Sequence, residues 1–213
     1  MTSSSFQDSA ALKPSERNEK AEQILAGARR VFLEHGFAAA TTDMIQQAAG
    51  VSKSTVYAHF PGKDALFAAV MRAECQKLLE QTRAIRIEGK MVRDSLMRFG
   101  THLLQMAVSP SGIALYRITV AEAARAPDIG RALYDAGPKL VEHELAAYLT
   151  EADRRGEIRV SDPGAAARDF VALALHDIGM RCLHGISAPP NVSQIRKIVN
   201  AAVNVFLRAY APL

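Results

Sequence analysis

The sequence contains no tryptophan and only two cysteines, Cys75 and Cys182, in 213 residues. Two cysteines this far apart in a chain of this length do not form a disulfide framework. We expect both to be buried small hydrophobic residues, with a redox switch as the alternative reading.

Long apolar runs are also missing. No stretch approaches the roughly 20 consecutive apolar residues that cross a bilayer. The first residues, MTSSSFQDSAALKPSE, show no apolar segment after a basic start, which a secretory signal would need. We therefore expect no membrane association, no secretory signal and a cytoplasmic location.

Signatures of common catalytic sites are absent as well. The chain has no Gly-x-Ser-x-Gly, P-loop, dinucleotide-binding glycine pattern, His-Glu-x-x-His or Cys-x-x-Cys. A di-iron helical bundle would need Glu-x-x-His on facing helices, whereas Glu142, His143 and Glu144 are adjacent and do not share a helical face. The sequence predicts no catalytic residues, no metal site and no cofactor, and thus not an enzyme.

Helical patterning runs through the whole chain. Hydrophobic residues make up 49% and charged residues 23% of the sequence, as in ordinary globular proteins, and the net charge is +4. This mildly basic balance is compatible with an anionic polymer as partner. Apolar residues recur at helical spacing, as in Ala21, Ile24, Leu25 and Ala28. With no convincing strand, we predict an all-α fold of about nine helices.

Residues 41–63 are typical of two short helices joined by a tight turn. Thr42 and Ser52 stand at N-cap positions. Gly50 suits a helix end that needs a positive φ, and Pro61-Gly62 ends the second helix. This is the helix-turn-helix arrangement, whose second helix lies in the major groove of DNA.

This stretch and its flanks resemble the N-terminal domain of the TetR family of transcriptional regulators over residues 21–70. The resemblance is carried by Phe32-x-x-x-Gly36-Phe37, Thr41-Thr42, Ala49-Gly50-Val51-Ser52, Tyr57-x-His59-Phe60 and Lys63-x-x-Leu66. It implies a three-helix DNA-binding head, a C-terminal helical bundle that binds a ligand and dimerises, and a homodimer on a palindromic operator. Gln46 departs from the family, which usually has Ala there, and we expect its longer side chain to tilt outward.

The resemblance also implies a division of the chain. We expect a flexible tail over residues 1–15 and a helix-turn-helix DNA-binding domain over residues 16–75, with the motif itself at 41–60. The remaining residues, 76–213, form the helical ligand-binding and dimerisation domain.

The candidate DNA contacts lie on the two short helices and just after them. By resemblance, Lys53 and Ser54 in the first turn of the recognition helix contact bases, since lysine can donate to guanine O6 and N7; the alternative for Lys53 is a solvated lysine. The Tyr57 ring can touch a thymine methyl group, and His59 either donates to phosphate or caps its helix. The full set is Thr42, Lys53, Ser54, Thr55, Tyr57, His59 and Lys63.

Charged residues inside apolar helices are candidates for an effector site, because a buried charge must be paired or bind something. Arg117 and Glu122 interrupt one apolar run. They form structural ion pairs or line the dimer interface, or else they read the polar end of a ligand. The candidate pocket comprises Phe99, His102, Leu103, Met106, Tyr116, Arg117 and Glu122.

The last two helices have wide apolar faces, which must be covered. Pairing with a symmetry mate would give a four-helix interface, in agreement with the family's mode of dimerisation. The candidates for this interface are Leu175, Ile178, Val199, Val203 and Phe206.

The main hypothesis is a DNA-binding transcriptional regulator. We expect a repressor that a small apolar or aromatic effector releases from a palindromic double-stranded operator. The alternatives are an activator, a regulator without an effector and, from another class, a helical interaction protein that does not bind DNA. A steep fall of affinity with salt would exclude the last of these.

Overall fold

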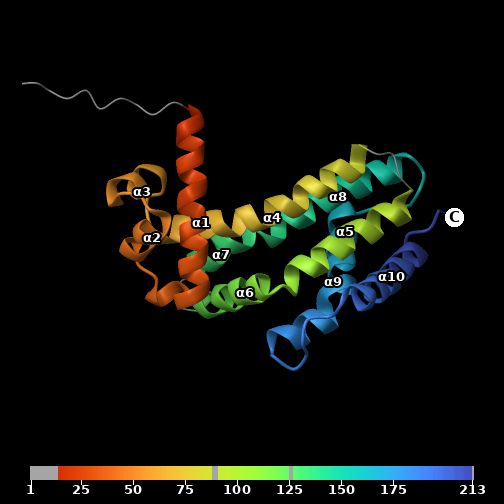
Figure 1. The fold of residues 1–213 in the computed structure, drawn as a ribbon. Helices are drawn as coiled ribbons and strands as arrows, with labels where there is room; N and C mark the ends of the chain where they lie inside the picture. Colours follow the sequence, from red (N-terminus) through yellow and green to blue (C-terminus); the bar gives the residue numbers. More distant parts are fainter. Residues whose placement is uncertain (1–13, 88–90, 125–126, 213) are drawn as a thin grey trace, which may run out of the picture.

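The computed structural model describes residues 14–87, 91–124 and 127–212. The predicted tail over residues 1–15 lies almost entirely outside these ranges, as do residues 88–90, where the sequence indicates a break. Residue 75 lies within them, but its side chain is not described, so the expectation for Cys75 is not tested. The described chain is all-helical and contains no strand (Figure 1). Its helices are α1 (Pro14–Ala39), α2 (Thr42–Ala49), α3 (Lys53–His59), α4 (Lys63–Ile87), α5 (Val92–Ala107), α6 (Pro110–Ala123), α7 (Pro127–Ala136), α8 (Pro138–Arg154), α9 (Pro163–Leu183) and α10 (Val192–Ala209).

The described ranges hold ten helices, one more than expected. The difference lies at Gly137, which the sequence places inside one kinked helix ending near Arg155. Gly137 instead has φ −121° and ψ −92°, and Pro138 begins a new helix after it. Proline lacks the backbone N–H that a continuous helix needs, but it is tolerated at the first helical position.

The first three helices and the start of α4 share one hydrophobic core. Phe67 of α4 packs against both Phe32 and Phe37, with ring centroids 4.9 and 5.2 Å away, and those two rings stack on each other. The kink at Gly36, where φ is 72°, turns the chain so that Phe37 folds back into this core. Leu115 of α6 is buried in the same core, so the head is packed against an element far along the chain.

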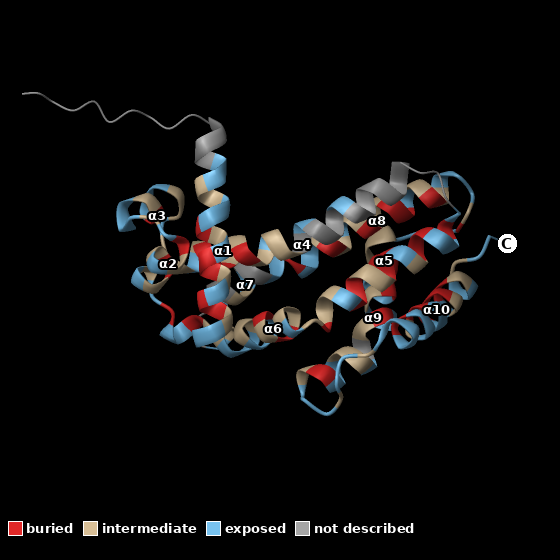
Figure 2. Ribbon diagram, in the orientation of Figure 1, coloured by how far each residue is buried: buried red, intermediate tan, exposed pale blue. Residues whose placement is uncertain are grey.

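A second core holds the C-terminal helices together. Phe170 of α9 contacts Phe99 of α5 and Phe206 of α10, at ring-centroid distances of 6.1 and 5.4 Å. Figure 2 shows the buried residues on the faces that these helices turn toward one another. Cys182 is a buried free thiol in this core, which confirms the expectation of a small buried hydrophobic residue.

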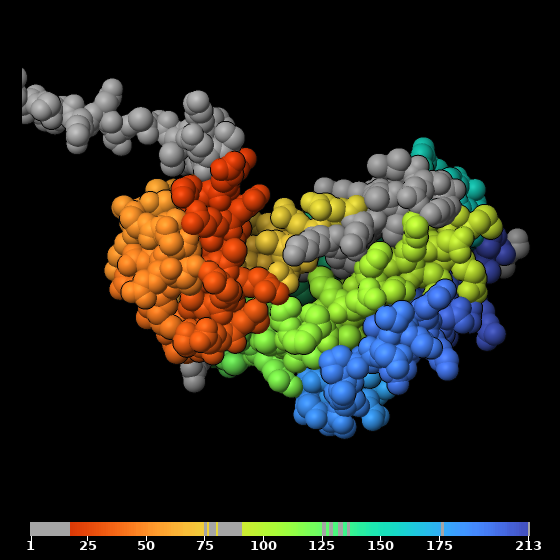
Figure 3. Space-filling model, in the orientation of Figure 1, coloured from red at the N-terminus to blue at the C-terminus, as the bar shows by residue number. Residues whose placement is uncertain are grey.

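Two helices join the head to the body of the molecule. Helix α4 packs against α1 at one end and against α5, α7 and α8 further along, and α6 packs against both α1 and α9. In Figure 3, α1 to α3 form a lobe at one end, beside the larger body built by the later helices. In the described part of the chain, no helix combines the length and apolar character that crossing a membrane requires.

Candidate nucleic-acid interface

Helix α2 is capped one residue earlier than the sequence suggests. The side chain of Thr41, rather than Thr42, accepts a hydrogen bond from the backbone N–H of Met44, at 3.2 Å. Thr41 has the extended backbone that an N-cap requires, whereas Thr42 is the first helical residue. The Thr42 hydroxyl is thereby left for another partner, and it lies 3.4 Å from the Tyr57 hydroxyl on α3.

The turn and the start of α3 are built as predicted. Gly50 adopts the left-handed conformation, with φ 65° and ψ 35°. Its N–H and that of Val51 donate to the carbonyls of Gln47 and Gln46, both at 3.1 Å. The Ser52 hydroxyl accepts from the backbone N–H of Thr55 at 3.1 Å and confirms the second N-cap. These contacts fix the angle between the two short helices.

Helix α1 holds α2 in place through contacts that sequence reasoning missed. The amide of Gln23 donates to the carbonyl of Ala49 at 2.6 Å, and the guanidinium of Arg30 donates to the carbonyl of Ala48. Both occupy carbonyls at the end of α2 that have no partner within the helix. A Cβ atom added to Gly27 would lie 2.8 Å from the backbone and side chain of Ala49, so only glycine permits this approach.

The expected outward tilt of Gln46 is wrong. Its side-chain Oε1 is buried and has no hydrogen-bond partner in the described residues. A buried amide oxygen without a partner is costly. Gln46 therefore places a polar atom inside the head, at a position where the family usually has the smaller alanine.

The exposed face of α3 carries two of the predicted DNA contacts, Lys53 and Tyr57. The Lys53 ammonium forms an ion pair with Asp43 of α2, at 2.9 Å. The hydrogen bond and the negative charge of Asp43 raise the pKa of Lys53 above its ordinary value, so this lysine is protonated. The Asp43 contact links two positions ten residues apart that the sequence pattern does not connect.

The other polar side chains of α3 lie either against its N-cap residue, Ser52, or in its last turn. The hydroxyls of Ser54 and Thr55 lie 2.8 and 2.7 Å from the Ser52 hydroxyl. His59 is half-buried in the last turn, with its ring 6.4 Å from that of Phe60. The structure thus brings the hydroxyls of Thr42 and Tyr57 together, whereas those of Ser54 and Thr55 lie against Ser52. The contacts of all these residues with DNA stay a prediction.

Lys63 has a structural role that the sequence does not reveal. Its ammonium donates to the carbonyls of Phe37, Ala38 and Ala40, at 2.8, 3.4 and 3.1 Å. It also lies 4.5 Å from the centre of the Phe37 ring. A cation here stabilises the carbonyls at the end of α1. A phosphate contact by Lys63 stays a prediction, and in this structure the ammonium is turned to the protein's own backbone.

The candidate pocket residues are dispersed in the body of the molecule. Phe99 and Leu103 are core residues, 2% and 3% exposed, whereas Tyr116 is 48% exposed on α6. His102 is half-buried, and its Nδ1 atom is buried without a hydrogen-bond partner in the described residues. Burial, and then the positive charge of Arg98, lower the pKa of His102. Of this set, His102 is the residue whose buried polar atom has no hydrogen-bond partner in the described part of the chain.

Arg117 is engaged by the protein itself. It is exposed, and its guanidinium donates to the carbonyls of Leu183, at 2.9 and 2.7 Å, and of Cys182, at 3.2 Å. It therefore caps the end of α9 instead of forming the ion pair considered from the sequence. Met106 packs against the C-terminal core and Glu122 is half-buried on α6.

The apolar faces of α9 and α10 are only partly available to a partner. Val199, Val203 and Phe206 are at most 1% exposed, so they cannot serve as partner-facing residues: their own chain already covers them. Leu175 and Ile178 are half-buried against the same core. Apolar periodicity identified the buried stripe of α10 and not its outer surface.

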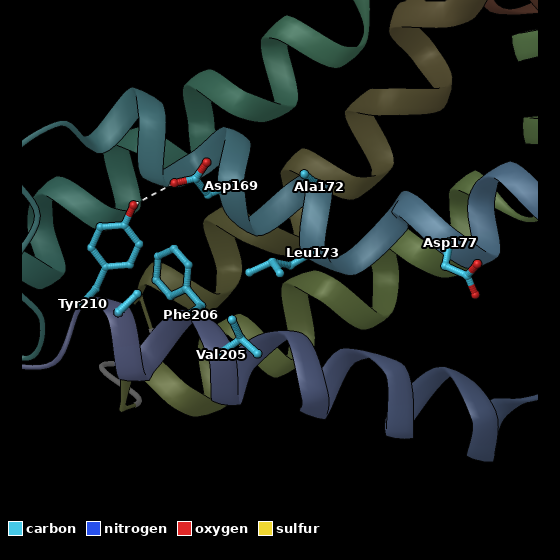
Figure 4. Close-up of a pocket in the computed structure, with 8 residues that line it drawn as sticks. Asp169, Ala172, Leu173, Asp177, Val205, Phe206 and Tyr210 are labelled. Atoms are coloured by element: carbon cyan, nitrogen blue, oxygen red, sulfur yellow. Dashed lines mark hydrogen bonds between the residues drawn. The ribbon is translucent and has the colours of Figure 1, made fainter.

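A groove runs over the outer side of α9 and α10 instead (Figure 4). Its volume is about 660 Å³. Leu173 and Val205 are its large exposed apolar residues, at 41% and 51% exposure. Beside them, the Tyr210 hydroxyl donates to Asp169 at 2.9 Å. The groove is lined by Asp169, Ala172, Leu173, Asp177, Val205, Phe206, Ala209 and Tyr210.

Two family models match this chain and together cover most of it. The model described as bacterial regulatory proteins of the tetR family matches residues 24–70. The model described as AefR-like transcriptional repressor, C-terminal domain, matches residues 94–212, which is more than half of the chain.

Individual relatives are similar in the head or over the whole fold. The HTH-type transcriptional repressor Rv1474c of Mycobacterium tuberculosis is 45% identical over 56 residues, which are 26% of this chain and 30% of that protein. The flavonoid-responsive regulator FrrA is 32% identical with a TM-score of 0.72, over 92% of this chain and 98% of its own. A TetR-family transcriptional regulator from Mesorhizobium loti has a TM-score of 0.80 at 24% identity, over 91% and 98%, and shares the fold.

Proposed function

The chain belongs to the TetR family of bacterial transcriptional regulators, and from this membership we propose that it is a repressor that leaves a palindromic operator when a small aromatic molecule binds. Membership points to regulation of transcription rather than to catalysis. The observation that carries the proposal is the capped α2–turn–α3 unit, with Lys53 and Tyr57 exposed on its outer face. The body behind it matches a repressor's C-terminal domain.

The operator is read by two heads. The N-terminal residues of a recognition helix contact base edges, and a dimer places two such helices about 34–36 Å apart, one turn of DNA. Lys53 and Ser54 are the proposed base contacts. Thr42 and Tyr57, whose hydroxyls lie 3.4 Å apart, are proposed to bind one phosphate between them, and Thr55 and His59 are proposed as further backbone contacts. A phosphate contact by Lys63 would require its ammonium to leave the carbonyls that it binds in this structure.

The two copies associate through the groove on α9 and α10. Leu173 and Val205 expose apolar side chains there, and an exposed apolar patch of this kind is typical of an interface. Pairing α9 and α10 with their counterparts would cover both residues in a four-helix arrangement. A glutamate in place of either Leu173 or Val205 would put a charge in the interface and is expected to give a monomer in analytical ultracentrifugation.

The effector is proposed to be an aromatic molecule that carries hydroxyl groups. FrrA, similar along nearly the whole chain, is a flavonoid-responsive regulator. In this chain the buried Nδ1 atom of His102 has no partner in the described residues. As a neutral imidazole it can accept a hydrogen bond from a phenolic hydroxyl, with Met106 on the next turn as adaptable apolar wall.

Effector binding changes operator affinity by shifting the population of two arrangements of the heads. Helix α4 and helix α6 both connect the body with the head core. A ligand that prefers one tilt of these helices favours one spacing of the recognition helices. The coupling is the difference in ligand affinity between the two arrangements.

Fluorescence anisotropy with labelled DNA from upstream of the protein's own gene tests the proposal. We expect saturable binding that weakens steeply as salt rises, and release when a hydroxylated flavonoid is added. His102→Ala should abolish release and leave DNA binding intact, whereas Gln105→Ala, an exposed change on the same helix, should alter neither. Binding of equal strength to scrambled DNA would refute an operator, and release of both variants alike would refute the role of His102.

A further inference from the structure

The ion pair between Asp43 and Lys53 has a consequence for how the head recognises sequence. Asp43 lies in the first turn of α2, and Lys53 is the first residue of α3. Their charged groups are 2.9 Å apart and both side chains are more than half exposed. The pair therefore stands on the outer face of the motif, where it links the start of one helix to the start of the other.

Lys53 is the one lysine or arginine within α2 and α3. The neighbouring cations of the head are occupied by the protein: the Lys63 ammonium by the carbonyls after α1, and the Arg30 guanidinium by the carbonyl of Ala48. A change in the environment of Lys53 thus alters the main positive charge that the recognition helix offers to DNA.

A lysine without a partner is a flexible point charge that binds any phosphate within reach, and such contacts carry no sequence information. A carboxylate beside the ammonium cancels its charge toward the phosphates and holds it at one position. The ammonium has three N–H donors, of which Asp43 takes one. The other donors can reach guanine O6 and N7, while the carboxylate can accept from a cytosine amino group.

We propose that Asp43 is a specificity-determining residue, which holds Lys53 for a guanine in each half-site and keeps it from the phosphates. This inference rests on the proposed operator binding. Asp43 lowers the affinity of the head for DNA of any sequence, and it increases the difference in affinity between the operator and other sequences. The Asp43–Lys53 unit places donors and an acceptor side by side, which complements the guanine O6 or N7 acceptor and the cytosine amino group of a G·C pair.

Asp43→Asn tests this inference, with the full-length protein, its upstream DNA and a scrambled duplex. Loss of the carboxylate frees Lys53 for a phosphate, so the variant should bind scrambled DNA several-fold more tightly. A plot of the logarithm of its DNA-binding constant against the logarithm of salt concentration should become steeper by about 0.9 for each head, which corresponds to one additional phosphate contact. Selection from a randomised operator should give a strong guanine preference at one position of each half-site for the wild type and a weakened preference for the variant.

Asp64→Asn is the matched control, because it removes the same charge from the first turn of α4 and from an exposed side chain. It should leave the base preference unchanged. Lys53→Met should also remove the guanine preference, and adding Asp43→Asn to it should change the salt slope no further, since Asp43 acts through Lys53. Thermal unfolding of each variant establishes that the fold is kept.

The outcomes separate this inference from the proposed function. Equal binding of the wild type to upstream and scrambled DNA would overturn the operator itself. Wild-type discrimination that Asp43→Asn retains in full would overturn only the role of Asp43. The role is equally refuted if Asp64→Asn relaxes base preference to the same extent, or if the Asp43→Asn effect on salt slope persists with Met at position 53.

Discussion

Lys63 provides the sharpest test of what the tertiary structure adds to the sequence. The resemblance assigns this lysine to a DNA phosphate, whereas its ammonium in the structure donates to the carbonyls of Phe37, Ala38 and Ala40. Lys63→Met keeps an unbranched chain as far as Cε and removes the ammonium group. We expect this substitution to destabilise the head, because it leaves carbonyls at the end of α1 without their donor.

The size of the effect follows from the contacts. A hydrogen bond to a charged group contributes about 1.5–3 kcal/mol, and a cation over an aromatic ring about 0.5–1 kcal/mol at a partly exposed site. The shortest contact is 2.8 Å, the side chain is partly exposed, and water replaces some of the lost bonds. We therefore expect a loss of about 1–3 kcal/mol in the free energy of unfolding.

Urea denaturation monitored by circular dichroism measures this loss, and Lys53→Met is the control. Lys53 is exposed and its ion pair is a surface pair, so its replacement should change stability by less than about 1 kcal/mol. The effect on DNA affinity should be the reverse: Lys53→Met should weaken DNA binding more than Lys63→Met does. If Lys63→Met unfolds at the same urea concentration as the wild type, the structural role of this lysine is refuted.

Three further predictions concern packing, the capping of α9 and pH. Gly27→Ala should destabilise the head by about 1–3 kcal/mol through the clash with Ala49, measured by thermal unfolding, whereas Gly179→Ala, which meets only Leu175 at 3.9 Å, should not. Arg117→Met should lower the unfolding temperature and speed hydrogen exchange at the end of α9, because the carbonyls there lose their donor. Burial lowers the pKa of His102 below its ordinary value of 6.5, so the unfolded chain binds the proton more readily than the folded one. The free energy of unfolding should therefore include a His102 contribution that is present above pH 6.5 and is lost as the pH falls below it. His102→Gln should reduce this pH dependence, as measured by urea denaturation between about pH 7.5 and 5.5.

Local chemistry made the helix-turn-helix predictable. Ser52 and Gly50 act within a few residues of their own positions: one hydroxyl accepts a nearby N–H, and one residue without a side chain adopts a positive φ. The first helix is likewise marked by an apolar stripe that ends at Gly36. The same local reasoning missed by one residue at Thr42, because two adjacent threonines have equal capping chemistry and only the backbone decides between them.

The body of the molecule was predictable only in kind. The apolar period on α10 correctly indicates a buried stripe, yet Val199 and Val203 turn out to be covered by the chain's own helices and not by a partner. The spacing of apolar residues along a helix indicates which side chains are buried, but it does not indicate whether the same chain or a partner buries them. The exposed apolar residues of the groove, Leu173 and Val205, were not among the interface candidates chosen from the sequence.

The sequence by itself determined the helical class, the motif and the family, because caps, turns and apolar stripes act between residues that are neighbours in the chain. The tertiary structure decided the partners of the charged residues. Asp43 with Lys53, Lys63 with the end of α1, and Arg117 with the end of α9 are joined across 10, 26 and 66 residues. Such pairs depend on how whole helices cross, and that is set by the packing of the two cores.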